Sequence, residues 1–360
     1  MNPVELSRVV LCAVRRAVDD GELRVVVPGR AVVTVPGAGG CGDYATNIAL
    51  QLARPAGQPS RRVAEVLRPY LLGADGIGDV VVSGPGFLNI SLHGAQAQAQ
   101  ERAHAHGSAS LVREILGSGV RYGYADGPTG QVVQLHAPHE VRAVVVMDVV
   151  ARLLRSQGAL VRTSCAARPE RAWAEVLGAG VDAYGTPDAP APLDVNVRPV
   201  PAAPVDPVSL GRDAGRWALL HAAAHDRPRA AADLLAQRES NPLFRVRYAH
   251  ARTRALSRNA ADLGFDAHPG DVQDVRELEI VLADHPRILA AAATRRAPDR
   301  LARQLLAVAD AVSPLLATVL PRGEEKPSAA HRARLALAEA AGTVLAGGLT
   351  LLGIDAPDHL

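Results

Sequence analysis

Lysine is almost absent from this sequence. Of its 39 lysine and arginine residues, Lys326 is the single lysine. An arginine guanidinium is a planar, permanently charged fork, whereas a lysine ammonium is a flexible point charge. The composition therefore excludes any mechanism that needs a lysine before residue 326. The formal net charge of +2 does not by itself demand a polyanionic partner.

Cysteine is rare as well. Cys12, Cys41 and Cys165 are widely spaced, odd in number and form no CxxC pair. This pattern is typical of a reducing compartment, and it argues against a disulfide framework or a zinc cluster. We therefore expect a cytoplasmic protein without a metal site.

Long apolar runs are also lacking. No run approaches the roughly 20 residues that cross a bilayer. The first ten residues, "MNPVELSRVV", are typical of an amphipathic helix and not of a secretory signal. We expect no membrane partner.

The first 94 residues predict a small α/β domain. A helix over 3–19 leads to two β-branched runs, "LRVVVPG" and "AVVTVPG". Asp43 is placed to cap a helix over 43–53, and Ser60 to cap a second one. "DVVVSGPGFLNISL" then predicts a hairpin that turns at Gly84-Pro85-Gly86.

The rest of the chain divides into four segments. Residues 95–127 predict a linking helix, with its helical part over 95–117, and 128–200 alternate strand and helix, which indicates a parallel sheet. Residues 201–211 are a proline-rich linker, and 212–360 predict a helix bundle. The expected helices of the bundle are 212–223, 227–240, 242–262, 272–283, 298–318 and 327–347.

"VVQLHAPHEVRAVVVMDVVARLL", Val132 to Leu154, predicts a strand, a tight turn and a helix. Such a turn can bind a nucleotide phosphate at the helix N-terminus, with His136 and His139 as candidate ligands. The alternative, which we favour, is that Pro138 starts the helix and both histidines are surface or cap residues. Asp148 and Arg152 form an i,i+4 pair that we expect on a solvated face.

Three stretches carry a resemblance to one family. "GDYATNIALQLA" with "GPGFLNISL" resembles the N-terminal add-on domain of arginyl-tRNA synthetases. "SNPLFRVRYAHARTRAL" resembles the first helix of their anticodon-binding (DALR) bundle, and "ARLALAEAAGTVLAGGLTLLGIDAP" resembles their last helix. The stretches follow the family's order. The resemblance implies three parts: an α/β N-terminal domain, a reduced Rossmann-like α/β middle domain, and an all-α anticodon-binding bundle.

The middle domain departs from the family's pattern. The family carries a His-x-Gly-His signature, where this chain has His136-Ala137-Pro138-His139. An alignment anchored on Arg142 and Asp148 instead loses both histidines. Proline puts a ring where a nucleotide would pack and removes an N–H donor. The family's lysine-containing loop has no lysine here, although Arg198 or Arg212 could supply charge. About 75 residues separate the signature from the bundle, too few for the half-domain that binds arginine.

The resemblance also implies contacts to tRNA. Tyr248, Arg252 and Arg245 fall in the segment that contacts the anticodon stem-loop, and Asn89 takes the place of a residue that reaches a D-loop base. An arginine stripe follows phosphates, and an aromatic ring stacks an unpaired base. The alternative reading is a solvated arginine-rich helix with Tyr248 in the core, and for Asn89 an edge hydrogen bond. The candidate RNA-binding residues are Asn89, Arg245, Arg247, Tyr248, Arg252, Arg254 and Arg258.

The sequence thus predicts a shortened arginyl-tRNA synthetase paralogue that binds tRNA, not DNA, and has lost catalysis. No cofactor is expected. One alternative is an ATP-dependent arginine–tRNA ligase that still uses His136 and His139, in which case ATP binds. Another is a scaffold for a protein partner in tRNA metabolism, such as a synthetase or a tRNA-modifying enzyme.

Overall fold

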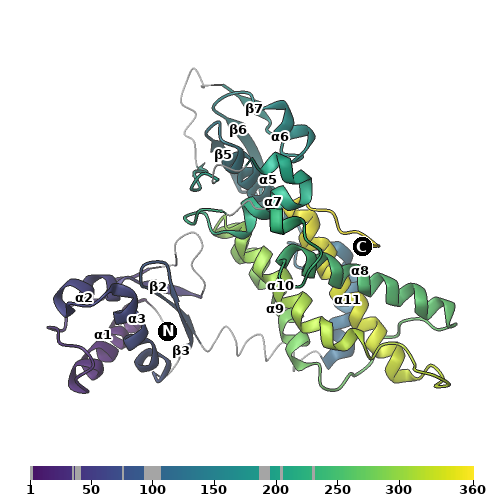
Figure 1. The fold of residues 1–360 in the computed structure, drawn as a ribbon, viewed down its shortest axis with the longest axis horizontal. Helices are drawn as coiled ribbons and strands as arrows, with labels where there is room; N and C mark the ends of the chain where they lie inside the picture. The colour runs from purple at the N-terminus through teal and green to yellow at the C-terminus, as the bar shows by residue number, and fades with distance from the viewer. Residues whose placement is uncertain are drawn as a thin grey trace. The chain divides into compact units, whose positions relative to one another are not determined.

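A computed structural model describes residues 3–34, 36, 42–74, 77–92, 107–185, 195–202, 206–228 and 232–360. The chain separates into two compact units, Met1–Glu101 and Arg102–Leu360, here called unit 1 and unit 2 (Figure 1). Each has its own hydrophobic core.

Unit 1 is an antiparallel sheet packed against helices. The strand order is β1-β2-β4-β3, and Leu88 and Ile90 of β4 are fully buried in the core. The elements are α1 (Pro3–Asp19), β1 (Val33–Thr34), β2 (Tyr44–Thr46), α2 (Ile48–Ala56), α3 (Ser60–Leu72), β3 (Ile77–Ser83) and β4 (Phe87–Leu92).

The predicted helix over 43–53 is wrong in its first part. Tyr44 to Thr46 form strand β2, which pairs with β4, and helix α2 starts only at Ile48. Asp43 does not cap this helix, because its Oδ2 accepts a hydrogen bond from the Leu92 amide at 2.9 Å. Gly42, at φ +80°, permits this pairing: a Cβ there would lie 2.7 Å from the Ile90 carbonyl oxygen.

Two smaller predictions in unit 1 are also wrong. Ser60 does not cap α3, since its hydroxyl donates to the Pro85 carbonyl and the N-cap position is Pro59. The first β-branched run forms no strand, and only Val33–Thr34 of the second does. Strands need a partner as well as a propensity.

Unit 2 combines a parallel sheet with a helical bundle. Residues 107–118 are helical, which agrees with the predicted end of the linking helix at 117, and residues 95–106 of that prediction lie outside the described residues. The sheet region holds η1 (Gly119–Arg121), β5 (Val132–Ala137), α5 (Val141–Ser156), β6 (Leu160–Cys165), α6 (Arg171–Glu175), β7 (Ala183–Tyr184) and β8 (Val195–Asn196). The helical region holds η2 (Pro207–Leu210), α7 (Gly211–His221), η3 (Ala232–Leu235), α8 (Pro242–Asp262), α9 (Arg276–Thr294), α10 (Pro298–Leu316) and α11 (Ala329–Leu352).

The second sheet is parallel, as predicted, with the order β7-β6-β5-β8. The chain winds outward from β5 to β6 and β7 and then returns to place β8 on the other side of β5. The strand order therefore reverses beside β5. In open parallel sheets, ligands bind outside the carboxyl ends of the strands at such a point. Here that position is the loop that follows Ala137.

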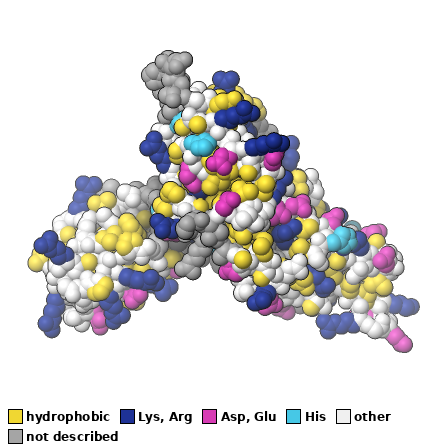
Figure 2. Space-filling model, turned by 45° about the horizontal axis from the view of Figure 1, so that its top comes forward, with side chains coloured by type: hydrophobic (Ala, Val, Ile, Leu, Met, Phe, Trp, Pro, Cys, Tyr) yellow, Lys and Arg dark blue, Asp and Glu magenta, His cyan; other side chains and the backbone are white. Residues whose placement is uncertain are grey.

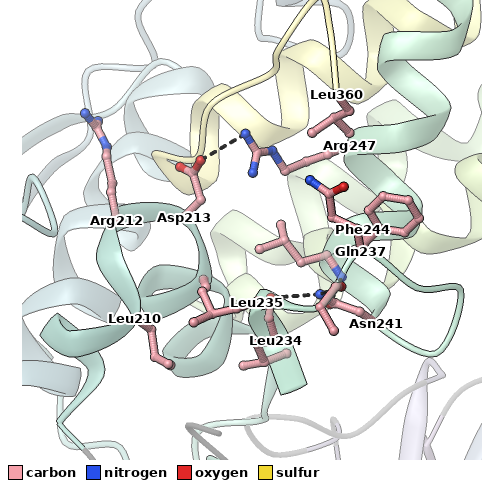
Figure 3. Close-up of a pocket in the computed structure, with 13 residues that line it drawn as sticks. Leu210, Arg212, Asp213, Leu234, Leu235, Gln237, Asn241, Phe244, Arg247 and Leu360 are labelled. Atoms are coloured by element: carbon pink, nitrogen blue, oxygen red, sulfur yellow. Dashed lines mark hydrogen bonds and ion pairs between the residues drawn. The ribbon is translucent and has the colours of Figure 1, made fainter. Parts of the chain in front are cut away.

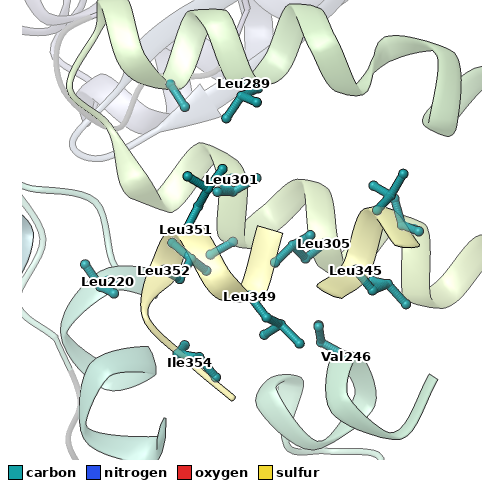
Figure 4. Packing of buried hydrophobic residues seen from close by; sticks show 14 of the residues in the cluster. Leu220, Val246, Leu289, Leu301, Leu305, Leu345, Leu349, Leu351, Leu352 and Ile354 are labelled. Carbon is teal, nitrogen blue, oxygen red and sulfur yellow. The ribbon is translucent and has the colours of Figure 1, made fainter. Parts of the chain in front are cut away.

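Helix α5 joins the sheet to the bundle. It contacts β5 and β6 on one side and α7, α9, α10 and α11 on the other. Because both sides are covered, α5 is buried around most of its circumference. Leucines of the bundle helices α7, α9, α10 and α11 meet in the same core (Figure 4).

Most bundle helices form close to where they were predicted, and α8 matches its predicted bounds of 242–262. The helix predicted over 272–283 is wrong at its end, because α9 continues eleven residues further, to Thr294. The helix predicted over 227–240 is wrong: among its described residues only Ala232–Leu235 form a helical turn, of the 3-10 type. The last helix continues five residues beyond its predicted end. Gly347 and Gly348 lie inside this helix, where they allow close packing: a Cβ on them would meet the Val120 carbonyl at 2.5 Å and the Leu305 side chain at 2.3 Å.

Helix α11 corrects the expectation that no apolar run is long enough to cross a bilayer. By length and composition alone it could cross a membrane, but 78% of its apolar window is buried inside the structure. Such burial is typical of the central helix of a bundle.

Candidate nucleic-acid interface and the loop after β5

The loop after β5 supplies the carboxylate that caps the N-terminus of helix α5. Glu140 is the N-cap of α5, and its two carboxylate oxygens accept hydrogen bonds from the amides of Arg142 (3.0 Å) and Ala143 (2.8 Å). These amides belong to the set of free donors that make a helix N-terminus an anion site. A phosphate group at this position would have to displace Glu140 and meet its negative charge.

Pro138 does not start α5, which corrects the sequence-based prediction. It precedes the N-cap by two residues, and its carbonyl accepts a hydrogen bond from the Glu140 amide at 2.8 Å. The carbonyl also lies 3.6 Å from the thiol of the buried Cys165. The proline thus shapes the turn that aims the Glu140 carboxylate at the helix.

The two histidines of the loop are held by neutral partners. His136 Nδ1 lies 2.9 Å from the Ser164 hydroxyl on β6. His139 is exposed, its Nε2 lies 3.0 Å from the Arg168 carbonyl, and its ring packs on Trp173 with centroids 4.9 Å apart. Their role in binding ATP stays a prediction.

Arg142, in the first turn of α5, has no exposed surface. Its guanidinium donates five hydrogen bonds, all to main-chain carbonyls, and most of these lie at the end of α7. Positive charge is favourable there because a helix C-terminus carries partial negative charge. The acceptors are the carbonyls of Val200, Leu219, Ala222, Ala223 and Asp226, at 2.5–3.1 Å.

Asp148 is not on a solvated face, contrary to the sequence-based prediction. Its Oδ2 lies 2.6 Å from Nη2 of Arg216, which is fully buried on α7, and 3.2 Å from Arg152. Arg216 also donates to the carbonyls of Leu177 (2.8 Å) and Leu352 (2.7 Å). The arginine fits because residue 353 is glycine: a Cβ there would lie 2.4 Å from the Arg216 guanidinium carbon.

Arg212 and Arg198 were considered as replacements for the missing lysine. Arg212 donates from Nε to the Gly353 carbonyl at 3.1 Å, which fixes the position of its guanidinium. Arg198 is exposed, two residues after β8. Among the described residues no group of three or more metal-binding side chains occurs.

Helix α8 presents an aromatic and basic face to solvent. Tyr248 is 46% exposed, so it is not a core residue, and its ring stacks on Phe244 with centroids 5.4 Å apart. Arg252 lies one helical turn further on and is exposed. Arg245, one turn before Tyr248, forms an ion pair with Asp310 of α10. We call Arg245, Tyr248 and Arg252 the α8 face.

The other candidate arginines of α8 are engaged within unit 2. Arg247 pairs with Asp213 of α7 at 3.3 Å. Arg254 pairs with Asp358 at 2.9 Å, and Arg258 donates to the Asp358 carbonyl at 3.2 Å. Exposed ion pairs stabilise a fold little, so Arg254 and Arg258 can exchange partners at small cost, whereas the Arg247–Asp213 pair is mostly covered.

A cavity of about 280 Å³ adjoins α8 on the side of Arg247. Figure 3 shows the Arg247 guanidinium between Asp213 and Leu360, with Phe244 and Gln237 across the cavity. Asn241 is structural here, because its amide donates to the carbonyls of Leu234 and Ala236. The cavity lies next to the α8 face through Phe244.

Asn89 was predicted to contact RNA, but its side chain lies inside the β3–β4 hairpin. Its side chain is 2% exposed and donates to the Ser83 hydroxyl at 2.6 Å, inside the β3–β4 hairpin. This is the edge hydrogen bond given above as the alternative. Contact between Asn89 and a tRNA base stays a prediction that requires the side chain to turn outward.

Charge does not single out a site on the face in Figure 2, where basic and acidic side chains are interspersed. The structure adds three groups that the sequence analysis missed: the Glu140 cap, the buried Arg142 and the Arg216–Asp148 pair. Sequence carried a signal only for Glu140, which stands immediately before the periodic apolar run, where an N-cap is expected.

Comparisons with known proteins match both ends of the chain to one class of protein. Residues 7–92 match the family model described as the arginyl tRNA synthetase N terminal domain, and residues 246–360 match the DALR anticodon binding domain. These domains define a class of tRNA-recognising enzymes, the aminoacyl-tRNA synthetases.

Two individual relatives are both named arginine–tRNA ligase. The arginine–tRNA ligase of Renibacterium salmoninarum is 41% identical over 175 residues, 45% of this chain and 30% of that protein. The arginine–tRNA ligase of Frankia alni is 25% identical across 100% of both chains, but that alignment runs over 564 positions for the 360 residues here. The chain belongs to the arginyl-tRNA synthetase family.

Similarity to a solved structure supports the assignment of the fold. A crystal structure from Campylobacter jejuni, described as an arginyl-tRNA synthetase, aligns with a TM-score of 0.54 at 12% identity. It covers 74% of this chain and 100% of that one. Mixed α/β architecture with a helical C-terminal DALR region is therefore the fold of this chain.

Proposed function

We propose that this chain binds tRNA and does not activate arginine. The observation that carries the first half is the α8 face. It exposes a tyrosine ring already stacked on Phe244, with guanidiniums one turn to either side. An exposed ring flanked by arginines suits an unpaired, splayed base and its phosphates. The match to the DALR anticodon binding domain begins on the same helix, which supports the anticodon arm as the bound part.

The second half of the proposal is supported by the loop after β5. The Glu140 carboxylate takes the amides on which a phosphate would depend, and no lysine precedes residue 326. Removing one preorganised charge-stabilising group costs about 10²–10³ in rate. The alignment with the Frankia alni relative runs over 564 positions for the 360 residues here, and the two matched family models lie on either side of the α/β region. Both observations favour loss of an arginine pocket.

The middle of the chain has a structural task in this proposal. The Arg142 and Arg216 bonds tie α5 to α7 and α7 to the end of α11. The sheet then serves as a support for the bundle, and unit 1 is proposed to bind the tRNA elbow. We propose tRNA as the partner and the cytoplasm as the location, with no cofactor.

Filter binding of arginine-accepting tRNA tests the first half. Changing Tyr248 to alanine is expected to weaken binding roughly 5- to 150-fold, because one stacked base contributes about 1–3 kcal/mol. Arg252→Ala is expected to weaken binding and to reduce its salt dependence, since one phosphate contact is lost. The matched control is Arg171→Ala on α6, whose side chain is 87% exposed and pairs with Glu175. Equally feeble binding by the parent and every variant would refute tRNA recognition.

Arginine–tRNA ligation is the second candidate function. It is favoured by the name of the relatives and by the position of His136 and His139 at the carboxyl end of β5. ATP–pyrophosphate exchange with arginine and tRNA separates the two candidates. We expect no exchange above background. Exchange that is present in the parent and abolished by His139→Ala would establish the ligase instead.

A further inference from the structure

Helix α8 carries a second basic stripe beside the α8 face. Arg254 and Arg258 follow His250 at intervals of four residues, so the three side chains lie along one side of the helix. At about 3.6 residues per turn, Arg254 lies about a third of a turn away from Tyr248 around the helix axis. Asp262, the only acidic residue of α8, forms no ion pair with a described residue. The charge of this stripe is therefore neutralised from another part of the chain.

Residues 354–359, which follow α11, run along this stripe. Ile354 is 3% exposed and belongs to the core. The amide of Asp355 donates to a carboxylate oxygen on α7 at 3.0 Å. The carbonyl oxygen of Pro357 lies 3.0 Å from Nδ1 of His250, whose side chain is buried. A carbonyl oxygen only accepts hydrogen bonds, so this nitrogen carries the proton. The segment is thus fixed to both α7 and α8.

Asp358 neutralises both arginines of the stripe. Its Oδ1 lies 2.9 Å from Nε of Arg254, and its carbonyl oxygen accepts from Nη2 of Arg258 at 3.2 Å. The hydrogen bond from Arg254, together with the charges of both arginines, lowers the pKa of Asp358, so its carboxylate is ionised at neutral pH. Arg252 of the α8 face, by contrast, makes no side-chain hydrogen bond or ion pair with a described residue.

This difference changes what each arginine offers to a phosphate. A phosphate that replaces the Asp358 carboxylate gains one charged contact and loses another, and the displaced carboxylate stays close enough to repel it. At Arg252 the contact is gained without such a loss. Non-specific RNA binding grows with the number of phosphates that are neutralised, so the paired stripe adds little to it. The ring of Tyr248 contributes only where an unpaired base can stack on it.

We propose that Asp358 is a specificity-determining residue of the α8 face. By occupying Arg254 and Arg258, it restricts phosphate binding to the side of α8 that carries Tyr248, so RNA without an unpaired base binds weakly. The proposal rests on tRNA binding by the α8 face and deepens it. A protein gains specificity by unfavourable contacts with the wrong ligand as well as by favourable contacts with the right one.

Filter binding of two RNAs to the full-length protein tests this role. The RNAs are arginine-accepting tRNA and a fully paired RNA duplex with the same number of phosphates. Asp358→Asn is expected to strengthen duplex binding about 3- to 10-fold and to steepen its salt dependence, because two arginines become available to phosphates. Binding of tRNA is expected to change less than about twofold, since stacking on Tyr248 keeps the tRNA on the other stripe. Asp358→Glu keeps the carboxylate and should bind both RNAs as the parent does.

The matched control is Asp262→Asn. It removes the same charge from the same helix, at an exposed carboxylate that has no ion-pair partner among the described residues. Equal gains on the duplex in Asp262→Asn and Asp358→Asn would reveal only an effect of net charge and would overturn the proposal. Equal gains on tRNA and duplex in Asp358→Asn would overturn it too. Adding Arg254→Gln to Asp358→Asn should remove most of the gain on the duplex.

The proposed function fails by a different result. A parent protein that binds tRNA no more tightly than the duplex refutes tRNA recognition by the α8 face. The duplex measurements still decide whether Asp358 competes with phosphates. A larger gain in Asp358→Asn than in Asp262→Asn supports that competition, and an equal or smaller gain contradicts it.

Discussion

Replacing Arg142 with methionine is expected to lower the free energy of unfolding of unit 2 by about 3–5 kcal/mol. Five main-chain carbonyls lose a donor in this variant, in two buried and three partly buried hydrogen bonds. Each unsatisfied buried polar group costs about 1–3 kcal/mol, less where the structure relaxes or water enters. Methionine keeps an unbranched apolar chain of similar length, so the lost packing is small. Urea unfolding followed by circular dichroism measures the change.

Arg171→Met is the matched control, because it removes a guanidinium that is 87% exposed. It is expected to leave the unfolding curve unchanged. Unit 1 serves as an internal control, since its separate core contains none of the affected residues. An Arg142→Met protein as stable as the parent would show that the five carbonyls find other donors.

The second large effect is expected from Asp148→Asn. This change leaves Arg216 fully buried without its carboxylate partner, and breaking a buried ion pair on one side typically costs about 3–5 kcal/mol. The same urea titration applies. Adding Arg216→Met to Asp148→Asn is expected to restore part of the stability, because the uncompensated charge is then removed.

The matching control for Asp148 is Glu175→Gln, which breaks the exposed pair with Arg171 and should have no measurable effect. A double variant less stable than Asp148→Asn alone would mean that the Arg216 bonds to the carbonyls of Leu177 and Leu352 matter more than its charge. These two predictions concern the support that holds the α8 face, so a loss of tRNA binding in either variant would follow from unfolding and not from a lost contact.

The sequence was informative where local signals and packing agree. Helix α8 begins at Pro242 behind the Asn241 cap, whose Oδ1 accepts from the Leu243 amide at 3.0 Å. Cap, proline and apolar spacing all predict this start. Strand β5 and helix α5 were predictable from their apolar patterns, although the start of α5 was assigned to Pro138 and its N-cap is Glu140. Failures occurred where a residue's partner is distant in sequence, as with Asp43, which bonds to Leu92.

The candidate site, too, was predictable from the sequence only in part. The RNA-facing residues could be proposed from one contiguous helix, because helical spacing places Arg245, Tyr248 and Arg252 on one side. Whether each arginine is free, paired or buried could not be predicted. Arg142 and Arg216 look like Arg252 in the sequence, yet both are fully buried and Arg252 is exposed.

The sequence by itself determined the family of this protein, the scarcity of lysine and the order of its parts, since each is a property of residues along the chain. Only the tertiary structure decided that Glu140 closes the helix N-terminus and that two arginines brace the sheet against the bundle. The physical reason is that hydrogen-bond satisfaction of a buried charge depends on carbonyls and carboxylates brought together from segments that are distant in sequence. No local pattern encodes that convergence.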